Sequence, residues 1–174
     1  MPRLVALLRA INVGGRTVKM DALKKIFEAD GFKNVATFIA SGNVLFDSKA
    51  KPEGLERRIE ALLQKELGYR VDTFIRSVPE LAEVAKTNPF PDTEGGTTHV
   101  GFTAEPFDKA AVEKVMALKT DIDSFHIEGS DLYWHCSIRS SDSKFSNAVL
   151  EKLLKRPATF RNIKTVRQLA AIQP

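Results

Sequence analysis

The order of apolar patterns in the first 77 residues permits few folds. Four short apolar runs predict strands, at residues 3–11, 34–40, 43–48 and 70–76. Two longer segments carry apolar residues at helical spacing and predict helices, at residues 20–32 and 52–69. The order strand–helix–strand–strand–helix–strand has few unknotted arrangements, because its crossovers must be right-handed. The usual arrangement is the ferredoxin-like α/β plait, with the first and third strands in the centre of the sheet.

The first predicted strand is apolar on both faces. Leu4 and Leu8 lie on one face, whereas Val5, Leu7 and Ile11 lie on the other. Helices cover only one face of a plait, so the second face needs another cover, and the second half of the chain is the candidate.

The second half of the chain repeats the first in a weaker form. A stretch rich in Pro, Gly and Asp at residues 88–96 predicts a loop or linker. A strand, a helix, a hairpin turning at Gly129 and Ser130, and another helix follow, but residues 158–162 give no clear last strand. We therefore predict an α+β protein of two ferredoxin-like (α/β-plait) domains packed together. The first spans residues 1–90, and the second, which is degenerate and ends in a basic helix, spans residues 91–174.

The plait topology brings two polar segments to one end of the first sheet. The exit of the first strand and the hairpin before the third strand share that end, and the two central strands are neighbours about 4.8 Å apart. We expect a polar cluster there, beside a helix N-terminus that favours anions. Its members are Arg9, Asn12, Gly14, Gly15, Ser41, Gly42 and Asn43. The alternative is that the glycines make a turn with positive φ and the asparagines cap backbone groups.

Four motifs resemble a known family. The segments LLRAINVGG, FIASGNVLF, TNPF and ATFRNIKTVRQL occur in this order over most of the chain. Together they resemble the bacterial family catalogued as domain of unknown function 1697. The resemblance implies two α/β-plait domains and no assigned activity. The family pattern has glycine where this chain has Ala10, and often glutamine where it has Ala40.

The last motif adds two candidate residues. Arg161 could clamp an anion or form an ion pair between domains. Asn162 could cap the last helix. If Arg161 reaches the Arg9 cluster, the site would lie between the two halves.

The positive charge is concentrated at the end of the chain. Residues 152–174 contain six lysines and arginines and no acid, so the net charge of +4 leaves −2 for the rest. Such a segment can be a solvated helix face, a partner for acids elsewhere, or a contact for anions or nucleic acid.

Other features exclude several classes of function. A single cysteine rules out a disulfide framework and suits a reducing compartment. No segment approaches the roughly 20 apolar residues of a membrane span. His126 and His135 could be diagonal neighbours on one sheet face, but two imidazoles without a third ligand make a poor zinc site. We expect a cytoplasmic protein without metal, cofactor or membrane partner.

The leading hypothesis is binding of a small phosphate- or carboxylate-bearing ligand at the loop end of the first sheet. The candidate residues are Arg9, Asn12, Gly14, Gly15, Ser41, Asn43, Arg161 and Asn162. The first alternative is a nucleic-acid-associated module that uses the basic C-terminal segment. The second is a protein-interaction module without a ligand.

Overall fold

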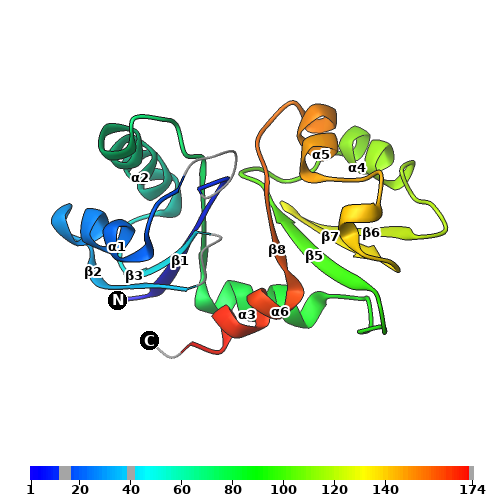
Figure 1. Ribbon diagram of the computed structural model, residues 1–174, viewed down its shortest axis with the longest axis horizontal. Coiled ribbons are helices and arrows are strands. Elements are labelled where there is room, and N and C mark those ends of the chain that lie inside the picture. The colour runs from blue at the N-terminus through cyan, green and yellow to red at the C-terminus, as the bar shows by residue number, and fades with distance from the viewer. Residues whose placement is uncertain (12–16, 39–41, 173–174) are drawn as a thin grey trace. The chain divides into compact units, whose positions relative to one another are not determined.

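The computed structural model describes residues 1–11, 17–38 and 42–172, and its chain forms two units (Figure 1). The first unit is Met1–Leu81 together with the chain end from Ala171, and the second is Ala82–Ala170. The division falls inside the helix α3 (Val78–Thr87), a few residues before the boundary that the sequence suggests.

The first unit is a complete ferredoxin-like plait. Its elements are β1 (Arg3–Leu8), α1 (Met20–Ala29), β2 (Lys33–Thr37), β3 (Asn43–Asp47), α2 (Pro52–Leu67) and β4 (Thr73–Ser77). The strands lie in the order β2-β3-β1-β4, and every neighbouring pair is antiparallel. The prediction of central first and third strands is therefore confirmed.

Both faces of the central strands in the first unit are buried. On one face Leu4 and Leu8 pack with Phe27 of α1 and Ile59 of α2. On the other face Leu7 is buried as well. Two-sided burial explains why β1 has a continuous apolar sequence and no polar alternation.

The first strand is shorter than its sequence predicts. The apolar pattern runs to Ile11, but β1 ends at Leu8, which places Arg9 after the strand. Ala10 has φ +55°, in the left-handed region, and this conformation cannot continue a strand. A left-handed backbone at this position also explains the glycine of the family pattern, because glycine adopts positive φ without a steric penalty.

The second unit repeats the plait and adds a helix. Its elements after α3 are β5 (Thr97–Phe102), α4 (Lys109–Met116), β6 (Asp123–Glu128), β7 (Asp131–Cys136), the 3-10 turn η1 (Ser140–Asp142), α5 (Asn147–Leu154), β8 (Thr159–Asn162) and α6 (Ile163–Ala170). The strand order β6-β7-β5-β8 matches that of the first unit.

One element of the second unit differs from the prediction. Residues 158–162 show no clear strand in the sequence, whereas the structure has β8 there, paired with β5. β8 is only 4 residues long and turns Arg161 towards a buried face. A strand this short with an inward arginine lacks the apolar alternation by which strands are identified.

Side chains of β7 alternate between two packed layers of the second unit. Trp134 belongs to the core that α4 and α5 cover, and these helices lie next to each other on one side of this sheet (Figure 1). Its neighbour Tyr133 faces the opposite way, where its hydroxyl donates to the Val84 carbonyl of α3 at 2.6 Å. The helix α6 packs against β5 and β8.

Candidate functional site

Four of the predicted site residues fall outside the described part of the chain. They are Asn12, Gly14, Gly15 and Ser41. The expected convergence of these residues at the loop end of the first sheet stays a prediction.

The two described members of that cluster, Arg9 and Asn43, have structural contacts. One guanidinium nitrogen of Arg9 lies 3.9 Å from the Asp72 carboxylate, and the side chain is 35% exposed. Asn43 is fully buried, and its amide donates to the Phe38 carbonyl at 2.8 Å. The Phe38 amide in turn donates to the Asn43 carbonyl at 3.0 Å, so Asn43 closes the turn between β2 and β3.

The second unit has a polar cavity of about 240 Å³. It lies where the loop 88–96, the start of β5, the end of β7 and the start of α6 meet. Its lining residues are Asp92, Thr93, Gly96, Thr97, Thr98, His135, Asn162, Ile163 and Lys164. We call it the α6 cavity.

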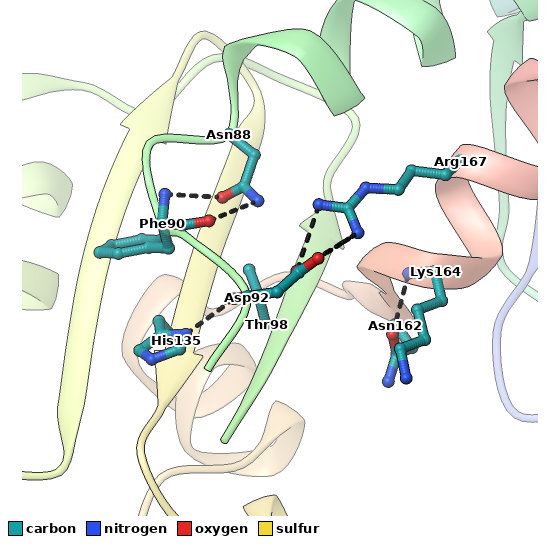
Figure 2. Close-up of polar contacts among 8 residues, drawn as sticks. All are labelled: Asn88, Phe90, Asp92, Thr98, His135, Asn162, Lys164 and Arg167. Carbon is teal, nitrogen blue, oxygen red and sulfur yellow. Dashed lines mark hydrogen bonds and ion pairs between the residues drawn. The ribbon is translucent and has the colours of Figure 1, made fainter. Parts of the chain in front are cut away.

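The loop that borders the α6 cavity is held by the TNPF motif. The Asn88 side chain makes two hydrogen bonds with the backbone of Phe90, both 3.1 Å long (Figure 2). The Phe90 ring stacks on the His135 ring, with centroids 5.4 Å apart and planes 19° from parallel. The motif therefore fixes the loop and packs against one wall of the cavity.

A bidentate ion pair holds the same loop to α6. Both guanidinium ends of Arg167 contact the Asp92 carboxylate, at distances of 3.1 to 3.3 Å (Figure 2). Asp92 lines the cavity, but this pairing neutralises its charge.

Two side chains at the start of α6 offer N–H donors. The Asn162 Oδ1 accepts a hydrogen bond from the Lys164 backbone amide at 2.9 Å, which caps the helix as predicted. Since this oxygen faces the helix, the amide nitrogen must face away from it. Figure 2 shows the Asn162 and Lys164 side chains extending the same way, each with nitrogen at its end. In the described part of the chain, the Lys164 ammonium makes no ion pair.

Hydroxyl groups and an imidazole form the other wall. His135 Nδ1 is hydrogen-bonded to Thr98 Oγ1 at 2.8 Å (Figure 2). Its Nε2 lies 3.5 Å from Thr93 Oγ1. The hydroxyl of Thr97 is buried, with no hydrogen-bond partner among the described residues. Thr97 precedes Thr98 on β5, so its side chain points to the opposite face from the Thr98–His135 pair.

Arg161 does not belong to the α6 cavity. It is not among the residues that line the cavity, and because successive residues of a strand point to opposite faces, it points away from Asn162. It is only 5% exposed, and one guanidinium nitrogen donates to Thr159 Oγ1 at 2.7 Å and to the Phe160 carbonyl at 2.9 Å. Burial lowers the pKa of Arg161 to about 10.

The basic C-terminal segment does not present all its charge to solvent. Arg161 donates to Thr159 and Arg167 pairs with Asp92, whereas Arg156 donates to the Glu105 carbonyl and lies 3.8 Å from the exposed Glu105 carboxylate. The three lysines of the segment are exposed: Lys152, Lys155 and Lys164.

The sequence analysis missed most of the α6 cavity. Asn162 is a candidate from the sequence, whereas His135 enters there only with His126, as a pair that makes a poor zinc site. Long-range strand pairing determines which residues border the cavity: Thr98 pairs with His135 on β7, and the next residue of β5, His99, pairs with Asn162 on β8. The available signal was the TNPF motif, whose Asn-x-Phe spacing predicts a side-chain-to-backbone turn.

The described part of the chain shows neither a cluster of metal ligands nor a membrane-spanning helix. Across residues 1–11, 17–38 and 42–172, no three His, Cys, Asp or Glu side chains gather as metal ligands would. No helix in those ranges has the length and apolar character that crossing a membrane requires.

Comparison with known proteins identifies the fold and the family. A solved structure, that of the conserved bacterial protein SP0830 from Streptococcus pneumoniae, superposes with a TM-score of 0.77 at 24% identity. The match covers 98% of this chain and 97% of the other, and it establishes a shared fold. None of the curated proteins compared with the chain matches it. The family described as "Protein of unknown function (DUF1697)" matches residues 1–133, and the chain belongs to that family.

Proposed function

We propose that this protein binds a small phosphate- or carboxylate-bearing ligand in the α6 cavity. The observation that carries the proposal is the pair of donors on one wall, the Asn162 amide nitrogen and the Lys164 ammonium. The anionic ligand is the class that the sequence suggests, but the proposed position is the second unit.

The charges around the α6 cavity favour an anion. Lys164 contributes a full positive charge, and the first turn of α6 adds the partial positive charge of a helix N-terminus. Asp92 is the lining carboxylate, and its ion pair with Arg167 offsets its repulsion of an anion.

The opposite wall supplies groups for the neutral part of a ligand. Thr98 and His135 hold each other in place, so their remaining donor and acceptor sites have fixed positions. Hydroxyl-bearing phosphates and carboxylates fit this wall better than simple anions.

The substitution Asn162→Asp tests the proposal without removing the helix cap. Aspartate caps a helix about as well as asparagine, so α6 stays intact, but the new carboxylate repels an anion. We expect Asn162→Asp and Lys164→Ala to abolish binding. A matched control is Lys152→Ala, which removes an exposed lysine that does not line the cavity.

Binding is measured by ¹⁵N NMR titration and thermal shift with inorganic phosphate and a panel of phosphorylated and carboxylated metabolites. A ligand present at 100 times its Kd adds about 2.7 kcal/mol of stability. Equal affinity in the wild type and Asn162→Asp contradicts the proposal. Loss of binding in Arg9→Ala alone points instead to the first sheet, and a response to DNA alone supports the nucleic-acid alternative.

A further inference from the structure

We infer a second binding site in the same unit, for a phosphate or carboxylate group that carries a short apolar chain. It occupies a cavity of about 220 Å³ between the start of α4 and the end of α5, distinct from the α6 cavity. Its lining residues are Asp108, Ala110, Ala111, Lys114, Leu153, Leu154, Lys155 and Arg156. We call it the α4–α5 cavity.

Three cations meet at this cavity, against one lining carboxylate. Lys114 comes from α4, and Lys155 and Arg156 follow α5. The carboxylate, Asp108, accepts a hydrogen bond from the Ala111 amide at 2.7 Å and caps α4. This cap occupies one of its oxygens, and the excess positive charge attracts an anion.

Arg156 is held in place by contacts that leave its charge largely uncompensated. Its Nη2 donates to the Glu105 carbonyl at 2.9 Å, and its guanidinium lies 5.5 Å from the centroid of the Phe107 ring. The Glu105 carboxylate is 3.8 Å away with a side chain 79% exposed, a geometry that contributes little. Its Nε is buried, with no hydrogen-bond partner among the described residues.

Lys155 occupies a backbone position that favours glycine. It ends α5 with φ +57° and ψ +36°, the left-handed conformation in which helices commonly place glycine. A lysine there costs free energy that a glycine would not. A strained residue whose side chain lines a cavity points to a use for that side chain.

The remaining lining residues are apolar and define the ligand class. Leu153 and Leu154 contribute aliphatic surface from α5, and Ala110 and Ala111 contribute methyl groups from α4. A bare inorganic anion would leave this surface uncovered. An alkyl phosphate or a short-chain carboxylate fits both the cations and the apolar residues.

The experiment is an ¹⁵N NMR titration of the full chain with hexyl phosphate and with inorganic phosphate. We expect hexyl phosphate to shift the amides of residues 108–114 and 153–156 and to bind at least fivefold more tightly than inorganic phosphate. The substitution Lys155→Gly should weaken the binding of hexyl phosphate at least fivefold, while the melting temperature of the protein stays equal or rises. A purely structural role for Lys155 predicts no change in binding.

Two further variants keep the test independent of folding. Ala110 is exposed in the first turn of α4, where an acid favours the helix. The Ala110→Glu variant should therefore fold normally but no longer bind hexyl phosphate, because the new carboxylate repels the anion. Lys152→Ala removes an equal charge from α5 outside the cavity and should bind as the wild type does.

Equal weakening by Lys152→Ala and Lys155→Gly overturns the inference, because it indicates unspecific attraction to a basic surface. Equal affinity for hexyl phosphate and inorganic phosphate overturns the inference that the apolar lining residues bind the alkyl chain. Asn162→Asp should leave hexyl phosphate binding here unchanged, so failure of the α6 cavity proposal and failure of this one are distinguishable.

Discussion

Ala10 has a backbone conformation that suits glycine, so replacing it by glycine should change the stability of the protein. Its φ of +55° lies in the left-handed region, which costs a non-glycine residue about 1–2 kcal/mol. Glycine loses more conformational freedom on folding, about 0.5–1 kcal/mol. We expect Ala10→Gly to raise the free energy of unfolding by about 0.5–1 kcal/mol, measured by urea denaturation.

The control for Ala10→Gly is the same substitution in a helix. Ala61 is exposed in the interior of α2, where glycine costs about 1 kcal/mol relative to alanine. Ala61→Gly should therefore destabilise the protein. Destabilisation by both substitutions contradicts the left-handed conformation of Ala10.

His99 makes the stability of the second unit depend on pH. Its ring lies 5.4 Å from that of Trp134, its Nδ1 is buried without a hydrogen-bond partner among the described residues, and burial lowers its pKa. The folded state therefore prefers the neutral imidazole, whereas the unfolded imidazole titrates near about 6.5. The stabilisation is complete above that pH and is lost as the pH falls below it, towards the folded pKa.

We expect the free energy of unfolding to fall between pH 7 and pH 5 in the wild type and to fall less in His99→Leu. His126→Gln is the control, since His126 is 38% exposed and contacts Glu128 at 2.9 Å. An unchanged pH dependence in His99→Leu, measured by urea denaturation across that range, contradicts the assignment.

At the scale of elements, the pairing of β5 with β8 depends on a glycine. A Cβ added to Gly101 would lie 2.7 Å from the ring of Phe160, its partner on β8. Phe160 is partly buried and packs against the core of the second unit, so its ring must shift to admit the new methyl group. We expect Gly101→Ala to cost about 1–3 kcal/mol, measured by urea denaturation followed through Trp134 fluorescence.

Gly54 gives the contrasting result for the same substitution. A Cβ at Gly54 meets nothing within 4 Å, and the residue lies in α2. Gly54→Ala should leave the stability unchanged or raise it by up to about 1 kcal/mol. A neutral Gly101→Ala contradicts the close packing of Phe160 over β5.

Elements with a strong local pattern could be predicted from the sequence, and those set by long-range pairing could not. β1 and β3 have apolar runs that identify central strands without any knowledge of the rest of the sheet. β8 lacks such a run, because Arg161 takes an inward position and obtains hydrogen bonds there. The end of β1 was missed for another reason: the conformation of Ala10 is not visible in an apolar pattern.

The candidate site was less predictable than the fold for the same reason. Asn162 could be found as a helix cap because a cap is a local feature. The contact of Thr98 with His135 needs the register of β5 on β7, which joins residues 37 positions apart. Local patterns predict the strand order but not the register of the strands. Polar groups from three elements could therefore not be assigned to one cavity.

At the scale of the whole molecule, two units share one strand order but differ in what they add to it. The second unit adds α6, and the start of this helix contributes Asn162 and Lys164 to the α6 cavity. Arg161 and Arg167 of the basic C-terminal segment have partners in this unit, while Lys155, Arg156 and Lys164 line the two cavities. The basic C-terminal segment thus contributes cations to both of the anion sites that we propose.

Anion binding in the α6 cavity is tested most directly by a crystal structure of the protein grown in inorganic phosphate, with the Asn162→Asp variant crystallised under the same conditions. We expect tetrahedral density in the α6 cavity, within hydrogen-bond distance of the Asn162 amide nitrogen and the Lys164 ammonium, and no such density in the variant. An empty cavity in both crystals, with phosphate bound beside Arg9 in the first unit, would contradict the proposal.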